Sequence, residues 1–487
     1  MPTQYVRFTG AADLRMRLVC STLSGRALRC VSRARRRLAT HLPDGPAAAD
    51  ASIRVVGSSR APLRSRPPFP RPRARSHASS PRPAVRSSRA RSRSRVDDIR
   101  ANDENPGLRD YEASALRLLD KLTNGMAVEI NESGTALKYK PGIVTGGRRI
   151  RHDCGSSRGI GYFLEMVLCV GLFAKKPVDV TLVGVTNDDA EISVDTFRAV
   201  TLPILKRQFG VEEGLALQIV RRSADAGGQT GEIQLKLPIA RELKTIDWTD
   251  EGLVKRVRGV AFTVRVSPQT GNRLVDASRA VLNKFLPDVY IFTDHHPGDG
   301  RENGQKGIRG KRARPGFGLS LVAETTTGCL VSADGASGAG RASATNVHAA
   351  AADADDLPLE EEEAAGGSGR VGGSSSLTHR GKKRSRDEAS TPEALGAATT
   401  EALMAEIQRG GVCDSAHQPL VALLMAIGPE QIQKARFGQL TPRAVKTLRT
   451  IRAFFGVTFD VQPEPESGTV FLSTVGAGIK NISRRAT

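Results

Sequence analysis

The feature that most constrains this chain is a Pro-Gly turn that lies between two arginines, immediately before a helical pattern. The turn is Pro106-Gly107, and Arg100 and Arg109 flank it. Apolar side chains then recur at helical spacing from Leu108 to Leu122, which predicts a helix. The N-terminus of a helix has unpaired N–H groups and the positive end of the helix dipole, so nearby guanidinium groups complete an anion site. Arg100 and Arg109 are therefore candidate contacts for an anion.

The chain is strongly basic, but most of its charge lies in one segment. The net charge of +21 over 487 residues is typical of proteins that bind nucleic acid. Residues 31–95 hold 17 arginines and two acidic residues, Asp44 and Asp50, so +15 of the +21 belongs to them and +6 to the rest. This segment is rich in Arg, Ser and Pro and lacks hydrophobic periodicity, which predicts disorder. The net charge therefore says little about the folded body.

Other patterns argue against a membrane protein and against a metal site. No apolar run approaches the roughly 20 residues that cross a bilayer. The six cysteines are scattered without a C-x-x-C pair, and several of them, such as Cys169, lie in apolar runs, so we expect buried free thiols. The eight histidines have no metal-ligand spacing. We therefore expect no metal, no cofactor and no membrane partner.

Several motifs resemble those of a known family. They are PGLR (Pro106–Arg109), HDCGSSRGIGYFLE (His152–Glu165), DVYIFTD (Asp288–Asp294), AETTTGC (Ala323–Cys329) and GGVCDSAHQ (Gly410–Gln418). With these motifs the chain resembles the RNA 3'-terminal phosphate cyclase family, and most sharply its branch of cyclase-like proteins of ribosome assembly. The resemblance covers nearly all of the chain outside residues 31–95 and 297–390.

The resemblance implies an α/β (α+β) fold, in which repeated strand–helix units carry a smaller inserted α/β domain. On this basis we predict six segments: the first strand and helix of the cyclase-like domain, 1–30; a disordered Arg/Ser/Pro-rich insert, 31–95; cyclase-like repeat units, 96–239; the small inserted domain, 240–335; a low-complexity acidic and basic linker, 336–390; and the C-terminal cyclase-like unit, 391–487.

The resemblance also implies that the cyclase chemistry is lost. Active cyclases form a covalent nucleotide adduct on a histidine in a C-terminal helix, and that position falls near Arg443 here. Arginine cannot replace it, because a guanidinium group stays protonated and is a poor nucleophile. The helix predicted from Thr441 to Phe455 contains no histidine. His417, which stands where the family has an acid, is expected to be a hydrogen-bonded residue at a helix entry and not a replacement nucleophile.

Several side chains of the family site remain as possible anion contacts. Arg15 is retained from the N-terminal turn, and the family fold implies that it lies near the two arginines of the Pro-Gly turn. Ser156-Ser157-Arg158 precedes a predicted buried helix and could hold a phosphate or only cap that helix. We predict no catalytic residue, and we name as RNA- or anion-binding candidates Arg15, Arg100, Arg109, Arg158 and Gln418.

The resemblance favours one function and leaves two others open. The favoured function is that of a non-cyclase, RNA-associated scaffold of the small-subunit processome, needed for 18S rRNA maturation and 40S ribosome biogenesis. It implies pre-rRNA and a ribosome-assembly GTPase as partners, and a location in the nucleus and nucleolus. The first alternative is an endonuclease that cuts pre-rRNA at an early site. An active cyclase is the weakest alternative, because the nucleophile is missing.

The basic insert has two interpretations. It separates Leu18–Arg29, which is predicted as a helix followed by the start of a strand, from Val96–Asp103, which resumes like the same strand. The segment is either a translated intron or a lineage-specific basic arm that contacts rRNA. We predict that deleting residues 31–95 leaves the thermal stability nearly unchanged or improves it.

Overall fold

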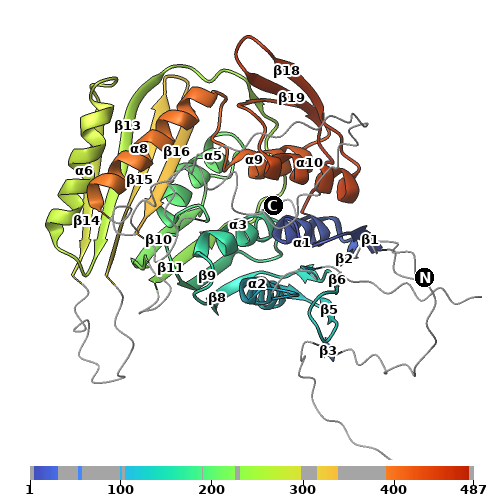
Figure 1. Cartoon of the computed structure of the whole chain (residues 1–487). Coiled ribbons are helices and arrows are strands. Elements are labelled where there is room, and N and C mark those ends of the chain that lie inside the picture. Colours follow the sequence, from blue (N-terminus) through green and yellow to red (C-terminus); the bar gives the residue numbers. More distant parts are fainter. Residues whose placement is uncertain are drawn as a thin grey trace, which may run out of the picture.

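The structure is a computed structural model, and its chain path is drawn in Figure 1. It describes residues 5–30, 53–56, 99–100, 105–188, 190–224, 231–297, 315–337 and 391–481. No helix within these ranges is long and apolar enough to cross a bilayer.

The body of the molecule is built from three units with the same order of elements. The first unit contains β1 (Tyr5–Phe8), α1 (Leu14–Ser24), β2 (Ala27–Cys30), α2 (Asp110–Leu122), β5 (Ala127–Ile130) and β6 (Leu137–Lys140). The second contains β8 (Gly147–Asp153), α3 (Ile160–Gly171), β9 (Val178–Gly184), the helical run α4 (Val194–Thr196), η1 (Phe197–Thr201) and α5 (Leu202–Arg207), β10 (Ala216–Arg221) and β11 (Gly231–Leu237). The third contains β12 (Asp247–Trp248), α9 (Gln418–Ile427), β17 (Ile432–Phe437), α10 (Pro442–Phe455), β18 (Asp460–Glu464) and β19 (Thr469–Val475). A short pair, β4 (Thr123–Asn124) and β7 (Ile143–Val144), joins the first two units.

The three units share one sheet topology. In each sheet the strands lie in the order first, second, fourth, third, as β1-β2-β6-β5, β8-β9-β11-β10 and β12-β17-β19-β18. The first strand runs parallel to the second, and the other neighbours are antiparallel. Identical topology in three consecutive units confirms the prediction of an α/β fold made of repeated strand–helix units.

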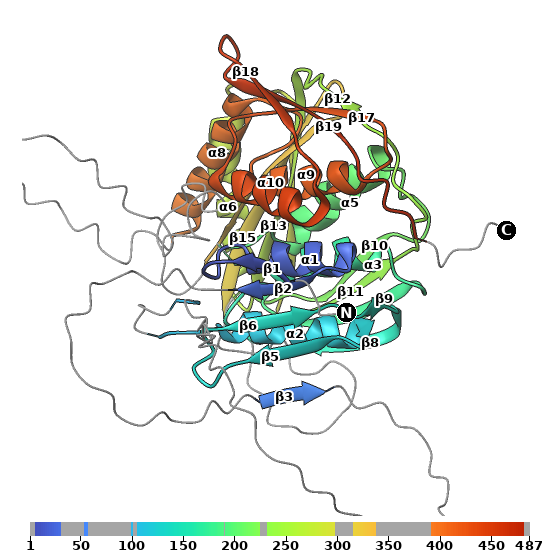
Figure 2. The ribbon, with the colours of Figure 1, turned by 90° about the vertical axis from the view of Figure 1, so that its right-hand side faces the viewer.

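The helices of the three units pack together into one core. Helix α1 contacts both α3 and α10, and α10 contacts α9. Figures 1 and 2 show α1 lying between the sheets of the first two units below and the α9–α10 pair above. Helix α3 is buried along its whole length because its sequence is apolar nearly all round. Helix α10 begins where the Thr441 hydroxyl accepts a hydrogen bond from the Ala444 amide, with Pro442 at the first position.

The inserted domain has a different topology and its own core. Its elements are β13 (Val254–Val264), α6 (Pro268–Leu282), β14 (Val289–His296), β15 (Gly316–Thr325), β16 (Leu330–Ala336) and α8 (Pro392–Arg409), with the sheet order β14-β13-β15-β16. Helices α6 and α8 pack on each other and on this sheet. Helix α8 thus belongs to the inserted domain, although the sequence places it in the C-terminal unit 391–487. Conversely, β12 pairs with β17, so residues just after 240 belong to the third unit.

The start and end of the insert lie next to each other on one strand. Cys30, the last residue of β2, is opposite Leu137 of β6, and the Ile99 amide donates to the Thr135 carbonyl two residues further along. Ile99 therefore occupies the place that a continuation of β2 would take, as the sequence predicts. Within 31–95 only Ile53–Val56 is described, and it forms an edge strand, β3, on β5. The prediction of disorder is wrong for these four residues, and the rest of the segment lies outside the described residues.

The prediction of buried free thiols is confirmed where it can be checked. The free and buried cysteines among the described side chains are Cys20, Cys154, Cys169, Cys329 and Cys413. The side chain of Cys30 lies outside the described residues.

Candidate functional site

Charged side chains from all three units meet in one buried cluster, which we call the junction cluster. It consists of Arg15 on α1, Glu165 on α3, Arg443 on α10, Arg158 just before α3 and Glu191 just before α4. Each of the first three comes from a different unit. The cluster therefore lies where the three repeats meet, and it contains three of the residues singled out in the sequence, Arg15, Arg158 and Arg443.

The two carboxylates of the junction cluster each bind two arginines. Glu165 Oε2 is 2.8 Å from Arg15 Nη2 and 2.8 Å from Arg443 Nη2. Glu191 Oε2 is 2.9 Å from Arg15 Nη1, and its Oε1 is 2.7 Å from Arg158 Nη2. At most 6% of the side-chain surface of Arg15, Glu165 and Glu191 is exposed. Arg15 is thus the central cation, held between two acids in a water-poor interior.

Electrostatics keep both acids ionised despite their burial. Burial alone would raise the pKa of Glu191, but Arg15, Arg158 and Arg443 outweigh it and hold that pKa at about 2. For Glu165, Arg15 and Arg443 likewise outweigh burial and lower the pKa. Burial would lower the pKa of Arg15, yet its two acids raise it. Arg15, Glu165 and Glu191 therefore stabilise one another's charged forms.

Two further carboxylates border the junction cluster. Asp13 precedes α1 with a left-handed backbone (φ 50°), and its Oδ2 accepts a hydrogen bond from the Thr447 hydroxyl of α10 at 3.1 Å. Asp188 accepts from the amides of Gly159 and Glu191, which fixes the loop before α3. Burial raises the pKa of Asp13, and burial together with Glu191 raises the pKa of Asp188 to about 6. These groups are harder to ionise than the two acids that bind arginines directly.

Two tyrosines line the arginines of the junction cluster. The Arg15 guanidinium lies 4.6 Å from the ring centroid of Tyr162, and that of Arg158 lies 5.3 Å from the ring centroid of Tyr111. The two rings are 5.2 Å apart in an edge-to-face arrangement. Such contacts favour a cation over an aromatic face, so both arginines are fixed by aromatic as well as ionic partners.

Arg100 and Arg109 lie outside the junction cluster, at the N-terminus of α2. The Glu112 carboxylate accepts hydrogen bonds from the two terminal nitrogens of Arg100 at 2.9 Å each. It also accepts a hydrogen bond from the backbone amide of Arg109 at 2.8 Å. The Arg109 side chain donates to the carbonyl of Asn105 at 3.3 Å. An internal carboxylate thus takes the position that an external anion would take at this helix end. The structure does not bring Arg100 and Arg109 together with Arg15 in one pocket. Anion binding by Arg100 and Arg109 stays a prediction.

The last two candidates have structural roles. His417 is fully buried; its Nδ1 is 2.6 Å from Asp414 Oδ1 and its Nε2 is 2.8 Å from the Thr201 hydroxyl. Burial would lower the pKa of His417, but Asp414 outweighs it and raises that pKa. Gln418 is buried as well and holds the loop before α10 through the Gln439 carbonyl and the Thr441 amide. The prediction that His417 is a hydrogen-bonded residue at a helix entry is confirmed, and the structure shows Asp414 as a partner.

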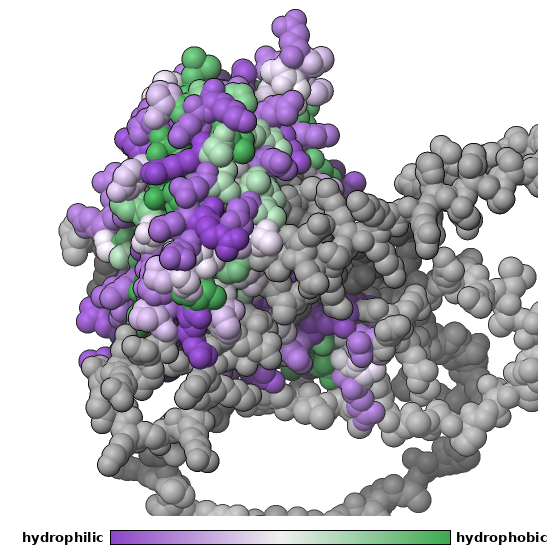
Figure 3. Space-filling model, turned by 60° about the vertical axis from the view of Figure 1, so that its left-hand side comes forward, coloured by the Kyte–Doolittle hydropathy of each residue, from purple (hydrophilic) through white to green (hydrophobic). Residues whose placement is uncertain are grey.

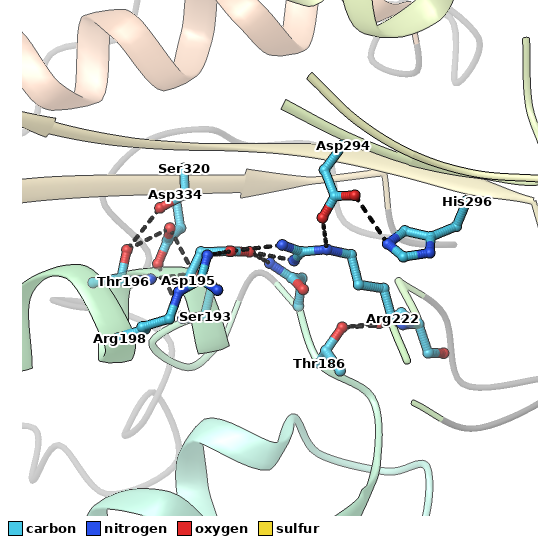
Figure 4. A network of polar contacts seen from close by, with 12 residues as sticks. Thr186, Ser193, Asp195, Thr196, Arg198, Arg222, Asp294, His296, Ser320 and Asp334 are labelled. Carbon is cyan, nitrogen blue, oxygen red and sulfur yellow. Dashed lines mark hydrogen bonds and ion pairs between the residues drawn. The ribbon is translucent and has the colours of Figure 1, made fainter. Parts of the chain in front are cut away.

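A second buried network fastens the inserted domain to the second unit (Figure 4). Arg222, which follows β10, binds Asp195 of α4 at 2.5 and 2.8 Å and Asp294 of β14 at 2.7 Å. Nearby, Asp334 of β16 accepts hydrogen bonds from Ser193 and Thr196 at 2.7–3.0 Å. We call this set the boundary network, because its partners belong to different domains.

Three charged residues of these two networks, Glu165, Glu191 and Arg222, were not identified from the sequence. Glu165 stands in the otherwise apolar run of α3, and an acid in a buried helix signals a buried cationic partner. That signal was available and predicts an ion pair without saying where the partner lies. Glu191 and Arg222 give no comparable signal, because both lie in polar loops. Within the described residues, no group of three or more His, Cys, Asp or Glu side chains is arranged to hold a metal ion.

Comparisons with known proteins agree with this architecture. The family model described as RNA 3'-terminal phosphate cyclase matches residues 86–461. A probable RNA 3'-terminal phosphate cyclase-like protein of Dictyostelium discoideum is 43% identical over 390 residues, which is 80% of this chain and 93% of the relative. The human RNA 3'-terminal phosphate cyclase-like protein is 41% identical, over 80% of this chain and 91% of its own length.

A third relative has a name that states a process. The rRNA processing protein rcl1 of Schizosaccharomyces pombe is 36% identical over 394 residues, which covers 80% of this chain and 92% of that protein. Matches of this extent, together with three units of one topology around the junction cluster, place the chain in a family. The chain belongs to the RNA 3'-terminal phosphate cyclase family, among its cyclase-like proteins.

Proposed function

We propose that this protein acts in rRNA processing as a non-cyclase, RNA-associated factor of small-subunit ribosome assembly. The observation that carries the proposal is the state of Arg443. This residue stands near the position of the adduct-forming histidine of active cyclases, and its guanidinium is ion-paired with Glu165 in the junction cluster. Its side chain is only 10% exposed.

The junction cluster has charges suited to holding elements together and unsuited to nucleotide transfer. Adduct formation needs a nucleophile with a free electron pair that can attack the α-phosphate. A guanidinium has no such pair at neutral pH, and α10 has no histidine to replace it. Arg15 and Arg158, which could contact a phosphate, already bind Glu165 and Glu191. The retained scaffold thus favours a binding role.

The family resemblance extends the proposal to partners and location. We propose that pre-rRNA and a ribosome-assembly GTPase of the small-subunit processome are partners, and that the protein acts in the nucleolus during 18S rRNA maturation. The name of the fission-yeast relative supports the process.

The first test concerns nucleotide chemistry. Purified protein is incubated with radiolabelled ATP and an RNA that ends in a 3'-phosphate, with an active cyclase in parallel. We expect no protein-bound nucleotide and no cyclic end on the RNA. An acid-labile adduct on this chain, formed at a rate near that of the active enzyme, would contradict the proposal.

The second test concerns the process. Depletion of the protein from cells of its own organism should lower 18S rRNA and accumulate its precursors, and the wild-type chain should restore processing. The purified chain is also incubated with a pre-rRNA fragment that contains the early cleavage sites. Specific cleavage by the pure protein would favour the endonuclease alternative, and normal 18S rRNA in depleted cells would refute a role in rRNA processing.

A further inference from the structure

The inserted domain carries all the aromatic residues of the described part of the chain that are at least half exposed. They are Phe285, Tyr290 and Phe292, which are 64%, 50% and 54% exposed. Only 4% of the sequence is aromatic, so this concentration within eight residues needs an explanation. Figure 3 shows the side of the molecule that carries α6 and β14, where apolar patches lie between hydrophilic groups.

Tyr290 and Phe292 project from a sheet face that packs on α4 of the second unit at β15 and β16 but leaves these two rings on the outer strand β14 exposed. They are two residues apart on β14, so they lie on the same face, and Ile291 between them is buried on the other. Helices α6 and α8 cover that other face, where Ile291 joins the domain core. The centroids of the two rings are 4.5 Å apart and the ring planes are inclined at 76°, which is an edge-to-face arrangement. β14 is also an outer strand of its sheet.

Cations lie beside this aromatic pair on the neighbouring strand. Arg258 of β13 is directly opposite Tyr290 in the strand register, and it pairs with Asp288 at 2.8 Å. Lys255 and Arg256 share Glu324 at 3.2 and 2.6 Å. All three cations have 36–40% of their side chains exposed. Three cations thus face two carboxylates, and exposed ion pairs of this kind contribute little stability, so a phosphate can compete with the carboxylates for these cations.

Exposed aromatic rings on an outer strand with cations alongside match the chemistry of unpaired RNA. Rings stack on the exposed π-face of any unpaired base, and cations contact the phosphates that follow it. A duplex hides its base faces inside the helix, so it cannot use the rings. A protein partner would need exposed aliphatic side chains around the aromatic pair. Val260, which is opposite Phe292, is half-buried and therefore offers little such surface.

We propose that Tyr290 and Phe292, with Arg258 beside them, form a platform that stacks one or two bases of single-stranded RNA. The inference rests on the proposed function, because it gives the inserted domain a direct contact with the RNA that the protein helps to process. The platform borders the boundary network, since Asp294 is two residues beyond Phe292 on the same strand and face.

The main test uses the full chain and a fluorescein-labelled oligouridylate of ~12 nucleotides, a length typical of such sites. At about 0.2 M salt, where phosphate contacts of the basic insert weaken, the double variant Tyr290→Ala/Phe292→Ala should bind about tenfold or more weakly than the wild type. Its melting temperature should be unchanged because both side chains are exposed. A matched control, Ile432→Ala/Val475→Ala, removes an exposed apolar pair on another sheet and should bind like the wild type.

Two further variants separate stacking from general apolar contact. Tyr290→Leu/Phe292→Leu keeps an apolar surface but removes the rings, so RNA binding should stay weak, whereas Tyr290→Trp/Phe292→Trp should restore it. Arg258→Gln should lower the dependence of log affinity on log salt by roughly 0.7, the value for one phosphate contact of a single strand. If the leucine variant binds like the wild type, base stacking is refuted.

Photo-crosslinking locates the contact independently of affinity. An oligonucleotide with 4-thiouridine should crosslink to the tryptic peptide that spans residues 285–301, which trypsin releases by cutting after Lys284 and Arg301. Wild-type affinity of the double alanine variant, or crosslinks confined to other peptides, would overturn the platform. A duplex RNA should not compete for the site.

The outcomes also separate the platform from the proposed function. Normal rRNA processing in depleted cells would refute the function and leave the platform standing if the purified protein still stacks RNA. A chain that is needed for processing but binds RNA without Tyr290 and Phe292 would refute the platform alone.

Discussion

The junction cluster and the boundary network use the same motif in different surroundings. In each, one buried arginine lies between two acids: Arg15 between Glu165 and Glu191, and Arg222 between Asp195 and Asp294. All three side chains of the first motif are at most 6% exposed. In the second, Arg222 and Asp195 are 2% exposed, whereas Asp294 is 39% exposed and also contacts His296 at 3.1 Å.

The difference shows how burial decides what an ion pair does. Where every partner is buried, removing one partner leaves a charge that water cannot solvate, so the pair fixes the arrangement of the elements. Where one acid reaches solvent, water can replace it at little cost. The junction cluster therefore holds the three repeats as one body, and the boundary network holds the inserted domain more loosely on one side.

The largest expected effect comes from Glu165→Ala. This change leaves Arg15 without one of its two acids and Arg443 without its partner, so the free energy of unfolding should fall by about 3–5 kcal/mol. Urea denaturation followed by circular dichroism measures it. The matched control is Glu242→Ala, which removes an exposed pair with Lys480 and should change stability by less than ~0.5 kcal/mol. Equal effects of the two changes would break the comparison.

The boundary network should show two unequal effects within one triad. Arg222→Ala leaves the buried carboxylate of Asp195 without its closest cation. The free energy of unfolding should therefore fall by about 2–4 kcal/mol. Asp294→Ala removes the exposed acid and should cost about 1 kcal/mol or less. Limited proteolysis should cut near the inserted domain faster in the first variant than in the second. Equal losses would mean that the two acids are equally buried in solution.

Acid should weaken the junction cluster over a defined range. The pKa of Glu191 is about 2 in the folded protein against the usual 4.5 in an unfolded chain. A lowered pKa stabilises the folded state above pH 4.5, and this stabilisation disappears as the pH falls towards 2. The slope of melting temperature against pH between 5 and 2 should therefore be shallower in Glu191→Gln than in the wild type. Parallel slopes would show that another acid carries the effect.

The smallest effect is expected where neither network is touched. Deleting residues 32–98 joins Cys30 to Ile99 through one residue, which is the spacing that their partners Leu137 and Thr135 require. The edge strand β3 is lost, but the core elements keep their contacts, so the melting temperature should change by no more than a few degrees. A large fall would show that the insert contributes to the folded body. A weaker salt dependence of RNA binding would support the basic-arm interpretation over the translated intron.

Much of the fold could be predicted from local patterns. The helices α2, α3 and α10 and the β5–β6 hairpin follow from apolar spacing, a Thr-Pro start and a turn sequence, all of which act within a few residues. The boundary of the inserted domain could not be predicted, because α8 is separated from its sheet by the segment 338–390 and its packing is a long-range contact.

The candidate site likewise has one part that the sequence predicts and another that depends on long-range contacts. The sequence by itself determined that α10 carries Arg443 and no histidine, and the identity of these side chains fixes what chemistry the helix can do. Only the tertiary structure decided which charges meet. It brought Arg15 and Arg443 to Glu165, from which they lie more than a hundred residues away in the chain, whereas Arg100 pairs with Glu112 only 12 residues away; the distances between folded elements decide which of these pairs form.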